Sequence, residues 1–138
     1  MEDGVSRTSL DPDLRERFKP LRRELGVSTF GLNQMALEPR QQGRIHRHAH
    51  QEEVYVVLEG TLTVALEGEE EELRAGEIMR VAPSVRRRLL NRGDTRVVVL
   101  ALGGAGEHAG RDGEAFPDWD ATEPVSPRDL PLPDDLPT

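Results

Sequence analysis

The sequence predicts an all-β domain, either a sandwich or a barrel. Between Val27 and about Leu102, short apolar runs with many β-branched residues are separated by Gly, Pro, Asn and Asp. Turn signals recur at intervals of about 8–12 residues, which is typical of sandwiches and barrels built from short strands. We therefore divide the chain into an N-terminal extension (residues 1–26), a barrel region (27–103) and a Gly/Pro-rich tail (104–138).

The N-terminal extension is polar and charged, with one short helical pattern. Asp11-Pro12 is followed by apolar residues spaced for one face of an amphipathic helix, namely Leu14, Phe18, Leu21 and Leu25. We expect one or two helical turns here. Pro20 should interrupt the helix and Gly26 should end it.

Eight candidate strands make up the barrel region. They span residues 29–37, 44–48, 54–58, 61–66, 72–74, 78–82, 87–90 and 96–102. Glu59-Gly60 predicts a tight turn between two of them, and residues 91–94 predict another. The acidic run at residues 67–72 is interpreted as a solvated hairpin tip rather than as an acidic site.

The tail is rich in proline and acidic residues. Its prolines at 124, 127, 131, 133 and 137 exclude a regular helix or an interior strand there. We expect an extended segment, partly disordered or packed over its own or a neighbouring barrel. Phe116 and Trp119 are the expected docking anchors, through simple packing.

Composition excludes several classes of protein. The chain of 138 residues carries a net charge of -8, which argues against general binding to nucleic acids. It has no cysteine, so disulfides and thiolate metal sites are unavailable, and this suits a cytoplasmic location. No apolar run approaches the ~18 residues that span a membrane, and the N-terminus lacks the pattern of a secretory signal.

The chemical signal lies in a cluster of histidines. His46, His48 and His50 occur within five residues, and Glu53 follows. Histidines two apart on a strand point to the same face, and imidazole with carboxylate forms a chelate for a divalent metal. Strand alternation places Tyr55 on the same face as Glu53, and Val54, Val56 and Leu58 on the other. Both faces are then apolar, which predicts a strand that is covered on both sides.

This stretch resembles the first signature of the cupin superfamily, whose members are small jelly-roll barrels. The signature runs roughly G-x5-H-x-H-x3-4-E-x6-G. His46 and His48 are followed by four residues, then Glu53, then six residues and Gly60, as the signature requires. The leading glycine departs from it, because Gly43 lies too near His46. The resemblance covers about residues 27–103 and implies a jelly-roll fold, a homodimer, and metal ligation by His46, His48 and Glu53.

The second cupin signature, roughly G-x5-P-x-G-x2-H-x3-N, is degenerate here. Counted from Gly76, Asn91 falls on the final asparagine, but Pro83 is one place late and Ser84 replaces the glycine. Arg87 stands where the resemblance places the fourth metal ligand, a histidine. The two histidines and one carboxylate that remain have the composition of the facial triad of non-haem Fe(II) proteins.

Arg87 leaves three arrangements open. A guanidinium about 5 Å from a divalent cation is repelled by roughly 6–7 kcal/mol at an effective dielectric constant of ~20. An anionic ligand could therefore lie between the metal and Arg87, which would clamp it. Alternatively, Arg87 fills the metal position, pairs with Glu53 and leaves the barrel metal-free. In the third arrangement, Arg87 swings outward and His50 replaces it as a ligand.

We therefore expect a small-molecule-binding cupin, with a pocket inside the barrel for a small anionic organic ligand. A divalent metal (Fe, Mn, Zn, Ni or Co) at the three ligands would make it a metal-dependent oxygenase or isomerase. A metal-free sensor or binding module is the competing class. Arg87, Tyr55 and Gln51 are the candidate ligand-binding residues, with core packing as the alternative for Tyr55 and a position behind the metal ligands as the alternative for Gln51.

Overall fold

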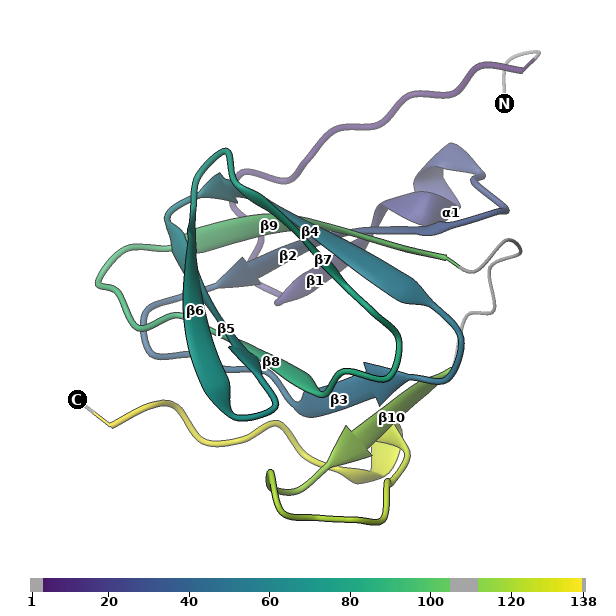
Figure 1. The fold of residues 1–138 in the computed structure, drawn as a ribbon. Coiled ribbons are helices and arrows are strands. Elements are labelled where there is room, and N and C mark those ends of the chain that lie inside the picture. Colours follow the sequence, from purple (N-terminus) through teal and green to yellow (C-terminus); the bar gives the residue numbers. More distant parts are fainter. Residues whose placement is uncertain (1–3, 105–111, 138) are drawn as a thin grey trace.

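Two five-stranded antiparallel sheets face each other in the computed structural model, which describes residues 4–104 and 112–137 (Figure 1). The first sheet has the order β1-β2-β9-β4-β7, and the second has the order β10-β3-β8-β5-β6. The elements are β1 (Phe18–Pro20), α1 (Leu21–Leu25), β2 (Gly31–Leu37), β3 (Ile45–His48), β4 (Glu52–Glu59), β5 (Thr61–Leu66), β6 (Glu69–Arg74), β7 (Ile78–Val81), β8 (Arg87–Leu90), β9 (Val97–Gly104), β10 (Gly113–Phe116) and the 3-10 turn η1 (Pro127–Asp129).

All eight strands predicted for the barrel region are present, as β2 to β9, and they form the two facing sheets of a jelly roll. A cluster of apolar side chains forms the core between the sheets. It includes Tyr55 and Val57 from β4, Leu62 and Val64 from β5, and Val97 and Val99 from β9, all at most 1% exposed. Burial of this apolar surface supplies the main driving force for folding.

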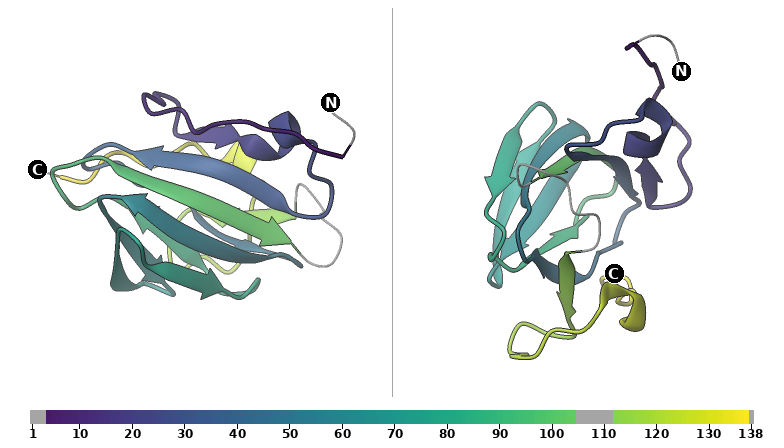
Figure 2. Two further views of the ribbon diagram at one scale, coloured as in Figure 1. Left: turned by 90° about the horizontal axis from the view of Figure 1, so that it is seen from above. Right: turned by 90° about the vertical axis from the view of Figure 1, so that its right-hand side faces the viewer.

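The sheets do not join into a continuous hydrogen-bonded barrel among the described residues. The edge strands β1 and β10 lie on one side of the molecule, at the margins of the two sheets (Figure 2). Each of these strands lies outside the predicted barrel region: β1 pairs with β2, and β10 pairs with β3. The barrel is thus extended at one side by a strand from each end of the described chain.

The acidic run is not confined to a hairpin tip, as the sequence analysis expected. Glu67 and Gly68 alone form the turn, with φ values of 50° and 88°. The glutamates from Glu69 onward continue as the edge strand β6, which pairs with β5. Exposed charges on an edge strand are tolerated because they face water, and they oppose pairing with another chain.

The predicted N-terminal helix has the expected length but begins later than its sequence pattern suggested. The helix α1 begins only at Leu21, after Pro20, and Gly26 ends it in the left-handed conformation with φ 74°. Proline disfavours helical geometry in the residue before it, so residues 18–20 extend and pair with β2 instead. The end at Gly26 was predicted correctly.

The two faces of β4 are unequal. Tyr55 and Val57 point into the core, whereas Leu58 on the outer face is 40% exposed and the neighbouring Ile78 on β7 is 64% exposed. The expectation that both faces of this strand are covered is therefore wrong within this chain. The N-terminal segment covers the outer face of β2, where Gln34 bonds to Asp11, but it does not cover Ile78.

The tail packs over its own barrel. Phe116 is fully buried and lies under the guanidinium of Arg86, whose carbon is 3.8 Å from the ring centroid. Trp119 is half-buried near Gly68. Within the described residues, no helix is long and apolar enough to cross a membrane.

Candidate metal centre

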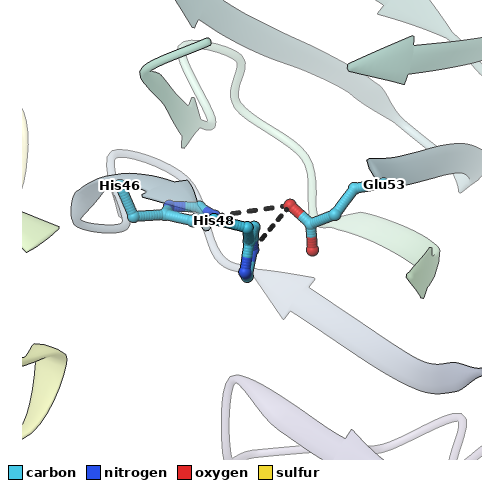
Figure 3. Close-up of side chains that lie close together, drawn as sticks. All are labelled: His46, His48 and Glu53. Carbon is cyan, nitrogen blue, oxygen red and sulfur yellow. Dashed lines mark ion pairs between the residues drawn. The ribbon is translucent and has the colours of Figure 1, made fainter. Parts of the chain in front are cut away.

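Three predicted ligands converge between the sheets. His46 and His48 project from β3, and Glu53 faces them from β4 of the other sheet (Figure 3). The Nε2 atoms of the histidines lie 3.5 and 3.2 Å from Oε1 of Glu53, in that order. Within the described part of the chain, one ligand atom from each residue falls within 4.8 Å of the others, as a metal ion requires. The structure thus brings together the three residues that the sequence predicted as ligands, and their binding of a metal stays a prediction.

The Nδ1 atom of each histidine, on the side of the ring away from Glu53, is hydrogen-bonded to another part of the chain. Nδ1 of His46 lies 3.1 Å from the main-chain oxygen of Arg44, and Nδ1 of His48 lies 2.8 Å from Oδ1 of Asp112. Because a carbonyl and a carboxylate only accept hydrogen bonds, both Nδ1 atoms carry the proton. The Nε2 atom of each ring is therefore the one that faces Glu53 and can coordinate a metal.

The resulting group needs a cation. Two nitrogen lone pairs and a carboxylate repel one another unless a proton or a metal ion lies between them. Among the residues that the structure describes, the buried Nε2 atom of His48 has no hydrogen-bond partner, although Oε1 of Glu53 is close. The donor set suits a divalent first-row metal with open positions. The residues present thus fit the metal that the sequence predicts.

Asp112 is the residue that sequence reasoning missed. It lies 64 residues after His48, in the tail, and its side chain is 6% exposed. Besides accepting from His48, it accepts from the main-chain N–H groups of His50 and Gln51, both at 2.9 Å. An aspartate before a glycine is typical of a turn. The local sequence therefore gives no sign that Asp112 hydrogen-bonds to a metal-binding histidine.

Burial and charge shift the pKa values of this group in opposite directions. Burial alone would raise the pKa of Glu53, but the contacts with His46 and His48 hold it well below its ordinary value. Burial alone would lower the pKa of His48, yet Glu53 and Asp112 raise it. Burial acts to raise the pKa of Asp112, which the N–H groups of His50 and Gln51 and the ring of His48 lower. The carboxylates stay ionised and attract a cation.

Arg87 lies inside the barrel and is fully buried. Its Nη1 atom donates to the main-chain oxygen of Val85 at 2.8 Å, and its Nε atom lies 3.6 Å from Oε1 of Glu53. The side chain therefore does not swing outward, as one of the three arrangements required. Its charge is balanced by Glu53 and by carbonyls of the loop before β8, and its role in ligand binding stays a prediction.

The other predicted residues surround the three ligands. Tyr55 is 1% exposed within the core and donates its hydroxyl hydrogen to Oε1 of Glu53 at 2.5 Å. Burial, together with the charge of Glu53, raises the pKa of this tyrosine well above its ordinary value. Gln51 donates from Nε2 to Oδ1 of Asp112 at 2.7 Å. His50 is exposed beyond the end of β3, and the structure does not bring it to the group.

Two pockets meet at His48. The polar pocket, of about 450 Å³, is lined by His48, Gln51, Glu53 and Asp112 together with Arg22, Arg23 and Asn33. A second pocket, of about 380 Å³, contains His46 and His48 and is mostly apolar. A metal at the three ligands would therefore be accessible to small molecules from two sides.

The chain belongs to the cupin family, because the model of the Cupin domain matches residues 33–103. A search of curated proteins found no match. The matched region contains the two histidines, Glu53 and Arg87, but it excludes Asp112.

Solved structures show the same fold. A cupin protein from Bacteroides fragilis is 24% identical, with a TM-score of 0.68, covering 78% of this chain and 91% of that chain. A sugar phosphate isomerase of the cupin superfamily from Silicibacter pomeroyi is 28% identical, with a TM-score of 0.59, covering 63% of this chain. This chain spans only 57% of that isomerase. The cupin domain of an XRE family transcriptional regulator from Enterobacter cloacae is 22% identical, with a TM-score of 0.54, covering 63% of this chain and 93% of that one.

Proposed function

We propose that this cupin binds a divalent metal at His46, His48 and Glu53 and uses it to bind a small anionic organic ligand. The observation that carries the proposal is the convergence of two Nε2 lone pairs on a carboxylate, with both Nδ1 atoms already engaged. When bound, the metal supplies Lewis acidity or a site for dioxygen. The chain's own residues supply the orientation of the ligands and the charge around them.

The charge balance supports an anionic ligand. With neutral imidazoles, the described site combines the positive Arg87 with the negative Glu53 and Asp112, which leaves one negative charge. A divalent cation reverses this to one positive charge in a largely buried setting, where uncompensated charge is costly. A monoanion restores neutrality.

Arginines in the polar pocket support the same ligand charge. Arg22 and Arg23 line this pocket. Among the described residues, Nε of Arg22 is buried without a hydrogen-bond partner, so an anion in the polar pocket would find an available donor. Arginine is suited to this task because its planar fork matches carboxylate and phosphate geometry.

Elemental analysis and metal titration test the proposal. Purified protein should contain one equivalent of Fe, Mn, Zn, Ni or Co, and chelated protein should rebind it in a calorimetric titration. His46→Ala and Glu53→Gln should abolish this binding. His50→Ala is the matched control, because His50 lies in the same segment but is exposed, and it should bind metal normally. A metal-free protein that does not take up metal would exclude the proposal.

A metal-dependent isomerase is the enzymatic form of this proposal that the comparisons support most. The similar protein from Silicibacter pomeroyi is described as a sugar phosphate isomerase, although the likeness covers only part of each chain. The metal-loaded protein should then interconvert an aldose phosphate and its ketose, followed by NMR. Loss of turnover in His46→Ala with retention in His50→Ala would support the enzyme over a binding module.

One observation favours a metal-free binding module as the second candidate. The buried Nε of Arg87 lies 3.6 Å from Oε1 of Glu53, which is how an arginine that replaces the metal would pair. In that case elemental analysis finds no metal, chelator has no effect on thermal unfolding, and Arg87→Met abolishes ligand binding. Stoichiometric metal in the purified protein would eliminate this candidate.

A further inference from the structure

An apolar chamber lies beside the two histidines. It encloses about 380 Å³, within the range of about 300–1,000 Å³ found for small-molecule pockets. Met35 and Leu37 of β2 line it from one sheet, and Leu89 of β8 lines it from the other. His46 and His48 form one part of its wall. The chamber thus offers hydrocarbon surface directly beside the nitrogen atoms of the metal group.

Much of the wall comes from outside the region that matches the cupin family. Five lining residues lie beyond residues 33–103, namely Arg17, Phe18, Gly113, Pro127 and Leu132. Phe18 belongs to β1 and Gly113 to β10, the edge strands on the open side of the barrel. The chamber is therefore completed by segments outside the matched region, while residues of the matched region form the rest of its wall.

The tail is held across the chamber by its main chain. Nε of Arg44 donates to the main-chain oxygen of Leu130 at 2.7 Å, and Nε2 of Gln42 donates to that of Asp134 at 2.9 Å. The N–H of Leu136 donates to the main-chain oxygen of Arg40 at 2.7 Å. The side-chain bonds of Arg44 and Gln42 join residues that are 86 and 92 positions apart in the chain. Together these contacts hold Pro127 and Leu132 in place as part of the wall.

The two arginines of the chamber are already engaged. Arg17 donates from Nη1 to the main-chain oxygen of Gln42 at 2.9 Å, and Arg44 is bound to Leu130 as described. Because the lining surface of the chamber is mostly apolar, the polar groups that face a ligand lie mainly at the histidine end. A polyhydroxylated ligand would leave buried hydroxyls unpaired in this chamber, whereas a hydrocarbon would lose nothing.

We propose that the chamber binds the hydrocarbon portion of a small organic carboxylate, whose carboxylate group faces His46 and His48. This assignment rests on the proposed function, because a metal at the histidines would receive the carboxylate. The ligand class that this chamber takes is therefore an amphiphilic monocarboxylate, whereas a polyhydroxylated sugar phosphate would bind from the polar pocket on the other side of His48. Phe18, Pro127 and Leu132 contact its apolar part and select for its length.

A series of unbranched carboxylates tests the assignment. Acetate, butanoate, hexanoate and octanoate are titrated into Co²⁺-loaded full-length protein by calorimetry. The dissociation constant should fall about fourfold for each added methylene until the chamber is filled, since burial of one methylene contributes about 0.8 kcal/mol. Affinity that stays flat or declines from acetate onward would overturn the assignment.

Variants of the chamber wall identify where the chain of the ligand lies. Leu132→Ser and Phe18→Ser should weaken hexanoate about fivefold to tenfold and leave acetate unchanged, because only the longer ligand reaches them. Leu132 is 43% exposed and Phe18 is 50% exposed, so neither change should unfold the protein. Leu58→Ser is the matched control, because Leu58 is 40% exposed on the opposite face of its sheet. Equal effects of all three variants would contradict the proposal.

A neutral series separates this proposal from the metal site. Acetamide, butanamide and hexanamide are titrated into chelated protein. If metal does not bind but affinity still rises with chain length and falls in Leu132→Ser, the metal proposal fails and the chamber assignment stands. If metal binds at His46, His48 and Glu53 but chain length has no effect in either series, the chamber assignment alone fails.

Discussion

At the scale of single residues, Asp112 connects the metal group to the tail. Its carboxylate fixes the ring of His48 through Nδ1 and simultaneously caps two main-chain N–H groups of the β3–β4 turn. A carboxylate behind a metal-binding histidine fixes the ring orientation and raises the basicity of the coordinating nitrogen. We therefore assign Asp112 a positioning role at this centre.

Asp112→Asn should lower metal affinity about 10-fold to 100-fold, the usual effect of removing such a partner. The amide has the shape of the carboxylate but cannot accept from His48 and from both N–H groups at once. Competition against a chromogenic chelator measures the affinity. Glu114→Gln serves as the control. Glu114 lies two residues after Asp112 and pairs with Arg47, so this variant should change metal affinity less than twofold. Equal losses in both variants would contradict a specific role.

The metal-free protein should lose stability as the pH rises above about 6.5. The contacts of His48 with Glu53 and Asp112 outweigh its burial and raise its pKa above 6.5. A group whose pKa is higher in the folded state stabilises the protein below its unfolded pKa, and this contribution disappears as the pH passes the folded value. Urea unfolding of chelated protein between pH 5 and 9 measures the trend.

His48→Gln should flatten this pH dependence, since glutamine does not titrate in the range. His50→Gln, which alters an exposed histidine, should leave it unchanged. Added Zn²⁺ should restore stability at the higher pH, because the metal takes the place of the proton between His48 and Glu53. A free energy of unfolding that rises steadily with pH in chelated protein would contradict this account.

The site was predictable where its chemistry lies in neighbouring residues. Alternation places His46 and His48 on one face of β3. That Glu53 meets them from β4 of the other sheet was implied by the resemblance to the first cupin signature. Asp112 was not predictable, because its position depends on β10 pairing with β3. For Arg87, the sequence left three arrangements open. The three-dimensional structure is needed to see that its Nε atom lies beside Glu53 and that the side chain does not point outward.

At the scale of elements, the turn at Gly60 controls the β4–β5 hairpin. Gly60 has φ 78°, and a Cβ atom there would lie 2.4 Å from the main-chain oxygen of Arg96. The close approach brings β5 against the segment before β9. Glycine is therefore required here for its conformation and for its lack of a side chain.

Gly60→Ala should lower the free energy of unfolding by about 3 kcal/mol or more, the sum of a left-handed conformation and a backbone clash. Gly76→Ala is the matched control. Gly76 has φ 92° and nothing within 4 Å of the added carbon. The Gly76→Ala variant should therefore lose only the free energy of the left-handed conformation, about 1–2 kcal/mol. Chemical denaturation measures both. Equal losses would mean that the contact with Arg96 has no energetic effect.

The strands of the jelly roll were predictable because short apolar segments between turn residues specify them locally. The segments at the two ends were not. Lys19 lies before a proline and is thereby turned from helix to strand. The strand β10 has the sequence Gly113-Glu-Ala-Phe116, which is too short for a clear alternation, and its identity comes from pairing with β3.

At the scale of the whole molecule, the residues that the structure describes leave the outer face of the first sheet uncovered near β4 and β7. Leu58 and Ile78 are exposed there, beside the half-buried Val54 and Val56. Contiguous apolar surface of this kind is typical of interfaces. It supports the homodimer that the resemblance to cupins implied, with a second copy of this chain as the partner.

Ile78→Lys should shift the protein from dimer to monomer, measured by sedimentation velocity across a range of concentrations. A buried lysine in a symmetric interface is destabilising twice, once from each subunit. Val5→Lys is the matched control, because Val5 is 61% exposed and Ile78 is 64% exposed. A wild-type chain that sediments as a monomer at all concentrations would refute the homodimer.

The position of β1, β10 and the tail around the chamber separates two tasks within one chain. The jelly-roll strands position the three metal ligands and form the stable core. Residues such as Phe18 and Leu132 line the chamber beside the ligands and are half exposed. Substitutions at these border positions can change which molecule is accepted without repacking the interior. Engineering of ligand choice in this protein should therefore begin with the appended segments and leave the sheets untouched.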